Sequence, residues 1–430
     1  MNAGDTAWLL AASALVLLMA PGLALFYGGM VRSKSVLNMM MMVFGALAVA
    51  AVAWVLVGYS VAFGDDVGLG LLGDPTQYLA FAHMLDGATV GHVPAPLFAV
   101  FQGLFGVITV ALIAGAIADR TRFGTWLVFT AIWTVLVYAP VAHWIFDAGS
   151  GGGWMANTLG ALDFAGGTAV EINSGAAGLA VALVLGPRLG FGRDPMKPHN
   201  LTLVMLGAGL LWFGWFGFNA GSALSAGSTA AVVFVNTLMA GCTGLLAWLL
   251  VERVRDGHAT SFGGASGVVA GLVAITPSCG AVTPFGAMLV GALAGAVCAL
   301  AVGLKYLFKY DDSLDVVGVH LVGGVVGTLL IGFLASAAAP QAVDGLLYGG
   351  GAGQLARQAV AVGATFVYSF AATALIAVVL ERTLGFRIDP EHESTGLDLV
   401  LHAETAYDLH VATAGARPHF GGHPTRTLDP

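Results

Sequence analysis

Residues 163–185 read DFAGGTAVEINSGAAGLAVALVL and have the length and composition of a membrane-spanning helix. At a rise of about 1.5 Å per residue, such a segment crosses the roughly 30 Å hydrocarbon core of a bilayer. Glu171 is the only charged residue between Phe164 and Leu185. A carboxylate at the centre of a membrane helix costs at least about 2.5 kcal/mol on insertion scales, so this glutamate requires a functional or structural reason.

The rest of the chain has a similar composition. Of its 430 residues, 58% are hydrophobic and 9% are charged, whereas about a quarter of a soluble domain is charged. The expected fold class is all-α integral membrane, with the lipid bilayer as its surroundings. Apolar stretches predict eleven transmembrane helices, near residues 7–30, 35–64, 96–118, 123–146, 163–186, 200–222, 229–251, 261–277, 282–304, 316–338 and 358–380.

Basic residues predict the orientation, because Lys and Arg accumulate in cytoplasmic loops. The loops after odd-numbered spans carry most of them, whereas the other loops carry acids, with Arg357 as an exception. We therefore expect the N-terminus outside and the C-terminus inside. The basic residues that support this orientation are Arg32, Lys34, Arg120, Arg122, Arg188, Arg193, Lys197, Arg253, Arg255, Lys305, Lys309, Arg382, Arg387, Arg417 and Arg426.

The sequence also predicts how the chain is divided into domains and whether its first apolar stretch is retained. We expect a transmembrane domain at residues 1–382 and a cytoplasmic tail at residues 383–430, which is charged and too short for a further domain. The first apolar stretch is longer than a signal-peptide core and lacks a basic leader, which predicts a retained helix. Cleavage near Pro21-Gly22 is the alternative.

Neither the cysteines nor the net charge suggests a further function. Cys242, Cys279 and Cys298 lie in or beside expected spans and show no disulfide or metal-ligand spacing. We therefore expect no metal and no cofactor. The net charge of −8 reflects loops and tail and argues against a nucleic-acid surface.

Helices one to five and six to ten are equal in number but start on opposite sides, which predicts an inverted repeat. Asp163 opens the fifth helix and Glu171 follows eight residues later, whereas Asp315 precedes the tenth and His320 follows five residues later. In antiparallel helices, both ionisable groups would lie about 10 Å inside their own membrane face, near the midplane. We expect Glu171 and His320 to form a proton-exchanging pair. A hydrogen bond that only locks two helices is the alternative.

Two further features accompany this pair. Small residues share a face with each member, so two smooth helix faces could close around a narrow lumen. Asp163 can be interpreted either as a helix N-cap or as a functional carboxylate. The glycines concerned are Gly167, Gly175 and Gly178 near Glu171, and Gly324 and Gly327 near His320.

Aromatic residues form a second candidate site, comprising Phe101, Phe105, Trp215 and Phe218, with Ser222 one turn after Phe218. Aromatic residues at helical spacing usually pack in cores or face lipid. Beside a buried carboxylate, however, they favour a small cation, because aromatic faces attract cations. A hydroxyl adds directional recognition that a spherical ion does not need.

Several long segments closely resemble the ammonium transporter (Amt/Mep/Rh) family. They are ALFYGGMVRSKSVLN, DFAGGTAVEINSG, PHNLTLVMLGAGLLWFGWFGFNAGS, GLVAITPSCGAVTPFGA, DDSLDVVGVHLVGG and GLDLVLHAETAY, in the family's order and along essentially the whole chain. The resemblance implies a homotrimer in which each eleven-helix subunit has its own pore. It also implies an outer vestibule that recruits ammonium, a gate of stacked phenylalanines and a hydrophobic lumen with two touching histidines.

Motif positions carry the family's roles onto individual residues. By this resemblance, Phe105 and Phe218 form the gate, and Phe101 and Ser222 belong to the recruitment site. The other implied roles are vestibule organisation without substrate contact for Asp163, the second lumen histidine for His320 and lumen lining for Trp215.

The chain departs from the family in two places. Glu171 stands where the family usually has its first lumen histidine, a replacement that resembles some fungal members. Phe146 falls where a vestibule tryptophan is usual and is followed by an apparent insertion. We assign Phe146 to the recruitment site, with Trp144 or Trp154 as alternatives.

Together these features predict an ammonium transporter rather than an enzyme. Ammonium would be recruited outside, lose its proton near the gate and cross as ammonia, because dehydrating a cation in an apolar lumen is costly. The proton would travel separately through Glu171 and His320. Methylammonium is an expected analogue, whereas potassium has no proton to give up.

The sequence also leaves two alternative functions and suggests one regulatory partner protein. An ammonium sensor usually carries an appended signalling domain, for which residues 383–430 are too few. A neutral-gas channel of the Rh type is less consistent with the aromatic residues and Ser222. The resemblance also suggests a PII-type signalling protein as a regulator that acts through the tail.

Overall fold

The computed structural model describes residues 1–149 and 151–407, and within them eleven helical segments are long and apolar enough to cross a membrane. The predicted all-α membrane fold and its eleven spans are confirmed. In chain order the spans are α1 (Ala3–Met30); α2, η2 and α3 (Val36–Ala53, Trp54–Gly58, Tyr59–Phe63); α4 (Ala95–Ala116); α5, η4 and α6 (Phe123–Trp133, Thr134–Tyr138, Ala139–Phe146); η6 and α7 (Gly167–Ile172, Asn173–Leu185); α8 (Leu201–Gly221); α9 (Ser228–Asp256); α10 (Ser261–Ser278); α11 and α12 (Pro284–Ala301, Leu304–Phe308); η7 and α13 (Val317–Leu321, Val322–Leu334); and α14 (Gly353–Thr383).

Shorter elements lie in the connections and after the last span. In chain order they are η1 (Ser33–Ser35), η3 (Leu79–Phe81), β1 (Thr89–Val90), β2 (Val93–Pro94), η5 (Met155–Leu159), η8 (Leu346–Tyr348), α15 (Pro390–Thr395) and α16 (Leu397–His402). Strands β1 and β2 pair antiparallel. The expected tail beyond residue 407 lies outside the described residues.

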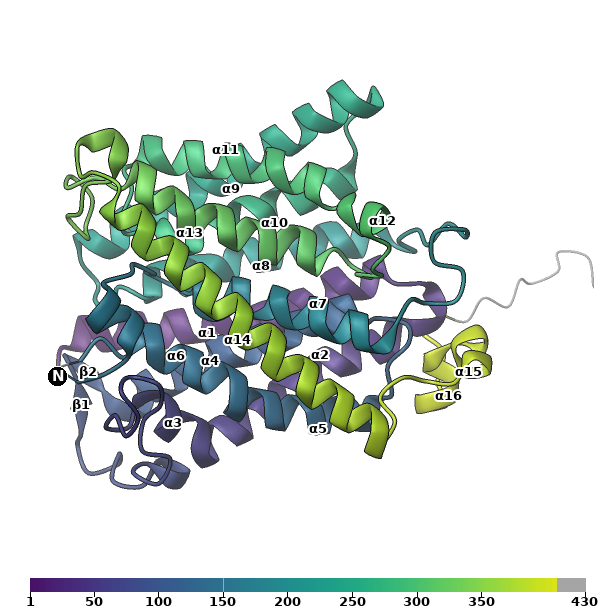
Figure 1. Cartoon of the computed structure of the whole chain (residues 1–430), viewed down its shortest axis with the longest axis horizontal. Helices are drawn as coiled ribbons and strands as arrows, with labels where there is room; N and C mark the ends of the chain where they lie inside the picture. The colour runs from purple at the N-terminus through teal and green to yellow at the C-terminus, as the bar shows by residue number, and fades with distance from the viewer. Residues whose placement is uncertain (150, 408–430) are drawn as a thin grey trace, which may run out of the picture.

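The helices form one elongated bundle with their axes roughly along its length (Figure 1). Helix α10, whose sequence is short and rich in Gly and Ala, is almost entirely buried among the others. Helix α14 runs obliquely across the outside of the bundle (Figure 1). Its 31 residues exceed the number that a perpendicular crossing requires, so a tilt brings its length into register with the bilayer.

The first helices of the two halves, α1 and α8, pack closely through glycines. A Cβ atom at Gly207 would lie 2.6 Å from the Cα of Phe26, and one at Gly29 would lie 2.6 Å from the carbonyl oxygen of Asn200. Neither distance is compatible with a side chain. Small residues therefore allow the two backbones to approach, as is usual where membrane helices associate without a hydrophobic driving force.

The fifth and tenth spans each begin with a capping aspartate at the same distance before an ionisable residue. Asp163 accepts hydrogen bonds from Gly167 N and Thr168 N, both at 2.7 Å. Asp312 likewise accepts from the backbone amides four and five residues later, at 3.0 and 2.7 Å. Glu171 and His320 each follow eight residues after their aspartate. The two caps thus place one ionisable side chain at the same depth of each span.

This geometry corrects the predicted correspondence between Asp163 and Asp315. Asp312, not Asp315, occupies the position of Asp163. Asp315 corresponds to Gly166, and both have positive φ, at 65° and 120°. Its carboxylate forms an ion pair of 2.7 Å with Lys305. The sequence has an aspartate at both position 312 and position 315, and only the hydrogen bonds show that Asp312 is the cap.

The glycines near Glu171 and His320 serve helix contact rather than a smooth lumen wall. A Cβ atom at Gly175 would lie 2.5 Å from the Leu321 amide nitrogen, and one at Gly324 would lie 2.8 Å from the Cβ of Glu171. The expectation that these faces line a lumen is therefore wrong. They let η6 and α7 cross α13 and η7 closely enough for the two ionisable residues to meet.

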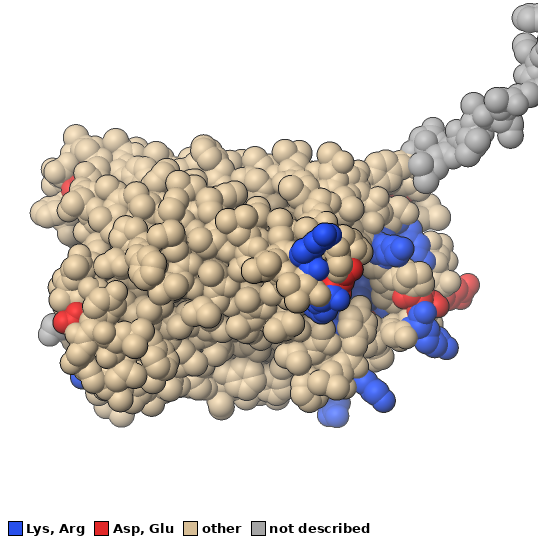
Figure 2. Space-filling view, turned by 90° about the horizontal axis from the view of Figure 1, so that it is seen from above, with Lys and Arg blue, Asp and Glu red and all other residues tan. Residues whose placement is uncertain are grey.

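Charged residues gather at one end of the bundle, which we call the basic end; Figure 2 shows Lys and Arg side chains there. Part of this charge is buried. Arg188 contacts both carboxylate oxygens of Asp311 at 2.9 Å and lies 3.5 Å from Asp119. Arg32 pairs with Asp119 at 2.9 Å, and the fully buried Arg120 lies 3.8 Å from Asp311. This network joins the loops of both halves.

Helices α15 and α16 dock on the basic end through hydrogen bonds. The Asp398 carboxylate accepts from the backbone amides of Leu37 and Asn38, at 3.0 and 2.8 Å, and so caps the start of α2. Glu393 pairs with Arg387 at 2.9 Å. Its other carboxylate oxygen accepts from the Leu189 amide at 2.7 Å. The segment after α14 is therefore tied to the connections that follow the first and fifth spans.

We expect Asp311→Ala to destabilise the protein by about 3–5 kcal/mol, because buried Arg120 would lose its carboxylate partner and buried Arg188 the closer of its two. Burial by itself would raise the pKa of Asp311, but Arg188 lowers it below its ordinary value of 3.8. The stabilisation is therefore fully present above pH 3.8 and is lost as the pH falls through the lowered value. Chemical unfolding in detergent measures the effect.

The exposed pair of Arg255 and Asp256 provides the control. The two side chains are 48% and 43% exposed at a separation of 2.8 Å, and such surface pairs contribute little. Asp256→Ala should leave the unfolding midpoint nearly unchanged. If Asp311→Ala and Asp256→Ala reduced stability equally, burial of the Asp311 network would not explain its contribution to stability.

Candidate transport site

The Glu171 and His320 side chains meet in the interior of the bundle. His320 Nδ1 lies 2.6 Å from Glu171 Oε2, and both residues are buried. Each lies on a π-helical turn at the start of its span, η6 or η7, a feature that is frequent at functional sites. A carboxylate and an imidazole in contact can exchange a proton. The same hydrogen bond also ties the two helices together, as a purely structural pair would.

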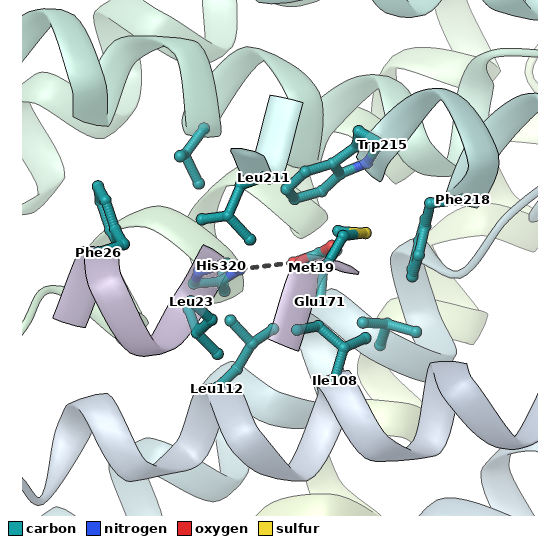
Figure 3. A pocket seen from close by; sticks show the side chains of 12 residues that line it. Met19, Leu23, Phe26, Ile108, Leu112, Glu171, Leu211, Trp215, Phe218 and His320 are labelled. Atoms are coloured by element: carbon teal, nitrogen blue, oxygen red, sulfur yellow. Dashed lines mark hydrogen bonds and ion pairs between the residues drawn. The ribbon is translucent and has the colours of Figure 1, made fainter. Parts of the chain in front are cut away.

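A narrow apolar lumen surrounds the pair (Figure 3). The space for the centre of a water-sized molecule is about 10 Å³, which is room for roughly one water. A similar cavity continues beyond His320 towards Phe26, Ser266 and Asp315. A hydrated cation would have to lose its shell to enter. The apolar residues that line the lumen include Met19, Leu23, Ile108, Leu112, Leu211 and Val269.

Trp215, to which its motif position assigns a lumen-lining role, lies in the wall of this cavity. Its indole N–H donates to Thr276 Oγ1 at 2.8 Å. The Thr276 hydroxyl in turn donates to the Leu272 carbonyl at 2.8 Å. Sequence reasoning missed Thr276, because a lone threonine in a membrane helix commonly bonds its own backbone.

A stack of two phenylalanines separates the lumen from a second cavity. The rings of Phe105 and Phe218 lie 4.1 Å apart at an angle of 25°. Phe218 lines the lumen, whereas Phe105 lines the cavity on the other side. The structure thus places the two expected gate residues in face-to-face contact across the path between the cavities.

The second cavity, which we call the outer cavity, lies at the end opposite the basic end. It offers about 520 Å³ to water-sized molecules, and Phe146, Ser222 and Asp163 all line it. The ring of Phe146 lies 6.2 Å from that of Phe105. Residues that sequence reasoning missed include Tyr59, Phe63, Tyr78, Phe98, Asp147 and Gln341.

Phe101 does not take the place expected for a recruitment residue. Its side chain is fully buried, and its ring packs edge-on against Phe105 at 5.0 Å. A Cβ atom at Gly221 would lie 3.0 Å from this ring. Phe101 therefore supports the phenylalanine stack from behind, because α4 turns this residue towards α8 rather than towards the cavity.

The structure also separates Phe146 from Trp144 and Trp154, the two alternatives for the aromatic residue of the recruitment site. Trp144 and Trp154 pack against each other at 5.9 Å, and the indole N–H of Trp144 donates to the Leu71 carbonyl at 2.8 Å. These two side chains pack in a cluster with Val141 and Met155, which Phe146 also contacts. Of the three aromatic candidates, Phe146 is the residue that lines the outer cavity.

Asp163 has the helix-capping role, which is one of the two interpretations that its sequence left open. Its carboxylate accepts from the Gly166, Gly167 and Thr168 amides at 2.7 Å and from the Thr168 hydroxyl at 2.5 Å. It therefore caps η6 at the edge of the outer cavity. With four donors already bound, its oxygens are occupied, which fits a residue that organises the site.

No group of three or more His, Cys, Asp or Glu side chains that could hold a metal ion occurs in the described part of the chain. Glu171 and His320 together supply only two such side chains. Their surroundings are apolar, which suits proton exchange better than coordination of a divalent cation.

Comparisons with known proteins agree on one family. The model of the Ammonium Transporter Family matches residues 7–407. An ammonium transporter of Mycobacterium tuberculosis is 55% identical over 443 residues, covering 97% of this chain and 93% of that protein. One of Aquifex aeolicus is 48% identical, covering 95% and 94%.

Solved structures show the same architecture. The crystal structure of Saccharomyces cerevisiae Mep2 superposes with a TM-score of 0.84 at 35% identity, covering 91% of this chain and 88% of that one. A sensor Amt protein superposes with a TM-score of 0.85 at 28% identity, covering 93% and 98%. With its eleven spans and its two cavities on either side of a phenylalanine stack, this chain belongs to the ammonium transporter family.

Proposed function

We propose that this transporter recruits ammonium in the outer cavity, removes its proton near the Phe105–Phe218 stack and conducts ammonia through the lumen into the cytoplasm. The observation that carries the proposal is the lumen itself. It has room for about one small molecule, and one proton-exchanging pair, Glu171 and His320, lies within its apolar wall. By the positive-inside rule, the basic end faces the cytoplasm.

The proposed division of ammonium into ammonia and a proton follows from the cost of dehydration. An ion that enters an apolar, water-sized lumen loses hydration that the walls do not replace. Ammonia carries no charge and avoids most of this cost. The proton that leaves ammonium is held at the Glu171 carboxylate or the His320 imidazole, which exchange it across 2.6 Å. At the basic end it rejoins ammonia.

The outer cavity supports a cationic rather than a neutral substrate. Aromatic faces of Phe105 and Phe146 and oxygen acceptors such as Ser222 line the same space, and each of these groups attracts a cation with N–H donors. A channel for a neutral gas would gain nothing from them.

The assembly and its regulation belong to the same proposal. We expect a homotrimer with one pore per subunit, as the family resemblance implies. The docked helices α15 and α16 lie at the basic end (Figure 1), where a cytoplasmic PII-type protein would reach them. Residues 1–382 would then be the transport domain and residues 383–430 the regulatory tail.

Purified protein in liposomes should carry ammonium and methylammonium but not potassium at a comparable concentration. Potassium has no proton to release and would have to enter the lumen as an ion. Currents driven by gradients of each cation measure this selectivity. A potassium current as large as the ammonium current would end the deprotonation mechanism.

Substitutions at Glu171 separate proton exchange from helix locking. Glu171→Gln keeps the shape and a hydrogen-bonding group but exchanges no proton, so net charge movement should fall at least about tenfold. Glu171→His should retain transport with altered pH dependence. Glu171→Leu should be worst for function, although removing a buried polar pair can stabilise the fold.

Size-exclusion profiles and unfolding midpoints provide the control for this series. If all three variants remain folded trimers, loss of current reports on the proton pathway. Full ammonium current with unchanged pH dependence in Glu171→Gln would make the bond to His320 structural only.

Deleting the tail from Gly396 onward should leave a folded trimer with reduced or unregulated transport. The deletion removes Asp398, whose carboxylate caps the first turn of α2. Transport assays with and without a PII-type protein measure the effect. A truncation after Tyr407 keeps every described tail contact and is the matched control; wild-type behaviour in both truncations would show that the tail is dispensable.

A further inference from the structure

The segment that follows α6 brings a second carboxylate to the outer cavity. Asp147 comes directly after the last residue of α6 and lines the cavity together with Phe146. Its side chain is 24% exposed. The C-terminus of a helix carries partial negative charge, which disfavours an acidic side chain there. Helix capping therefore does not explain this aspartate.

Asp147 and Asp163 line the same cavity but differ in their hydrogen bonds. The carboxylate of Asp163 accepts four hydrogen bonds from η6 and its flanking residues. Among the described residues, no Lys or Arg pairs with Asp147, and its ionic neighbour is His143, whose Nδ1 lies 3.6 Å from Oδ2. That nitrogen is closer to the Ala62 carbonyl, at 3.0 Å. One backbone hydrogen bond, from Gly149, reaches the Asp147 carboxylate, so acceptor positions remain for an incoming cation.

The backbone around Asp147 fixes the position of this carboxylate. The Asp147 carbonyl accepts from the Gly153 amide at 2.8 Å and from Asn157 Nδ2 at 3.0 Å. A Cβ atom at Gly152 would lie 2.6 Å from the Asp147 carboxyl carbon, so a side chain at this position would displace the carboxylate. The glycine-rich segment therefore holds Asp147 closely at the cavity wall.

A second acceptor lines the same cavity. The Gln341 side-chain oxygen is buried and has no hydrogen-bond partner among the described residues. Its backbone is fixed by a hydrogen bond of 2.9 Å from its amide to the Gly280 carbonyl. A buried polar atom without a partner is costly unless a ligand or water satisfies it. A cation with several N–H donors would satisfy both Gln341 and Asp147.

The electrostatic surroundings of Asp147 also favour a bound cation. Burial raises the pKa of its carboxyl; the nearby His143 imidazole and a backbone hydrogen bond from Gly149 oppose the shift, and Asp66 adds to it. The charged form is thus under-stabilised by the protein alone. A bound cation would supply the missing stabilisation.

We propose that Asp147 is a specificity-determining residue of the outer cavity, whose carboxylate binds the incoming ammonium ion alongside the Gln341 oxygen and the ring of Phe146. The inference rests on the proposed function, in which this cavity receives the cation before it loses its proton. It adds an ionic contact to recognition by aromatic faces and hydroxyl groups. Selection for a monovalent cation then begins before the phenylalanine stack.

The test compares three variants of the full chain in liposomes, with ammonium currents recorded over a range of concentrations. Asp147→Asn keeps the shape but removes the charge and should raise KM by about three- to tenfold, with the maximal current largely retained. Asp147→Glu should stay close to wild type. Asp86→Asn removes an exposed outer carboxylate that does not line the cavity and should leave KM unchanged.

An unchanged KM in Asp147→Asn would overturn the proposal, and so would an equal rise of KM in Asp86→Asn. A lower maximal current of Asp147→Asn at constant KM would also overturn it, because that result indicates a structural role. If Asp147→Asn does not fold, Gln341→Met tests the same site through its other acceptor, and an unchanged KM there overturns the proposal as well. Wild-type protein without ammonium current would instead refute the proposed function.

Discussion

The hydrogen bond between Glu171 and His320 sets the requirements that the surrounding structure meets. A carboxylate and an imidazole can meet in a membrane interior only if two helices approach closely at that depth. Gly175 and Gly324 provide this approach, because side chains at either position would collide with the other helix. The caps formed by Asp163 and Asp312 then fix where each helix begins. The position of this one buried pair thus explains close-contact glycines and helix caps that would otherwise look unrelated.

The cost of dehydration explains why the proposed pathway is divided between two cavities. A cation is best held where oxygen atoms and aromatic faces replace part of its water, and such groups line the outer cavity. Ammonia is best conducted where the walls are apolar and the space is small, as in the lumen. The stacked rings of Phe105 and Phe218, 4.1 Å apart, stand between these two environments. Neither cavity could perform both tasks.

The fold was largely predictable because hydrocarbon length and the distribution of charge are local properties of the sequence. The pairing of Glu171 with His320 was also accessible, since both follow a helix start at a countable distance. Other features depend on contacts between distant segments. The choice of Asp312 over Asp315 as the cap depends on φ and hydrogen bonds. The burial of Phe101 behind Phe105 depends on how α4 faces α8. Gln341 reaches the cavity from a connection whose path no periodicity reveals.

Glutamate at position 171 also changes which state of the lumen pair carries charge. Two neutral histidines have no net charge and become positive when they accept a proton. Glutamate with neutral histidine is negative before it accepts a proton and neutral afterwards. In surroundings of low polarity an uncompensated charge is costly, so the Glu171–His320 pair is best accommodated when it holds the proton. In the proposed mechanism, such a pair favours uptake of the proton from ammonium, and the harder step is its release towards the basic end, where Asp315 lines the cavity beyond His320.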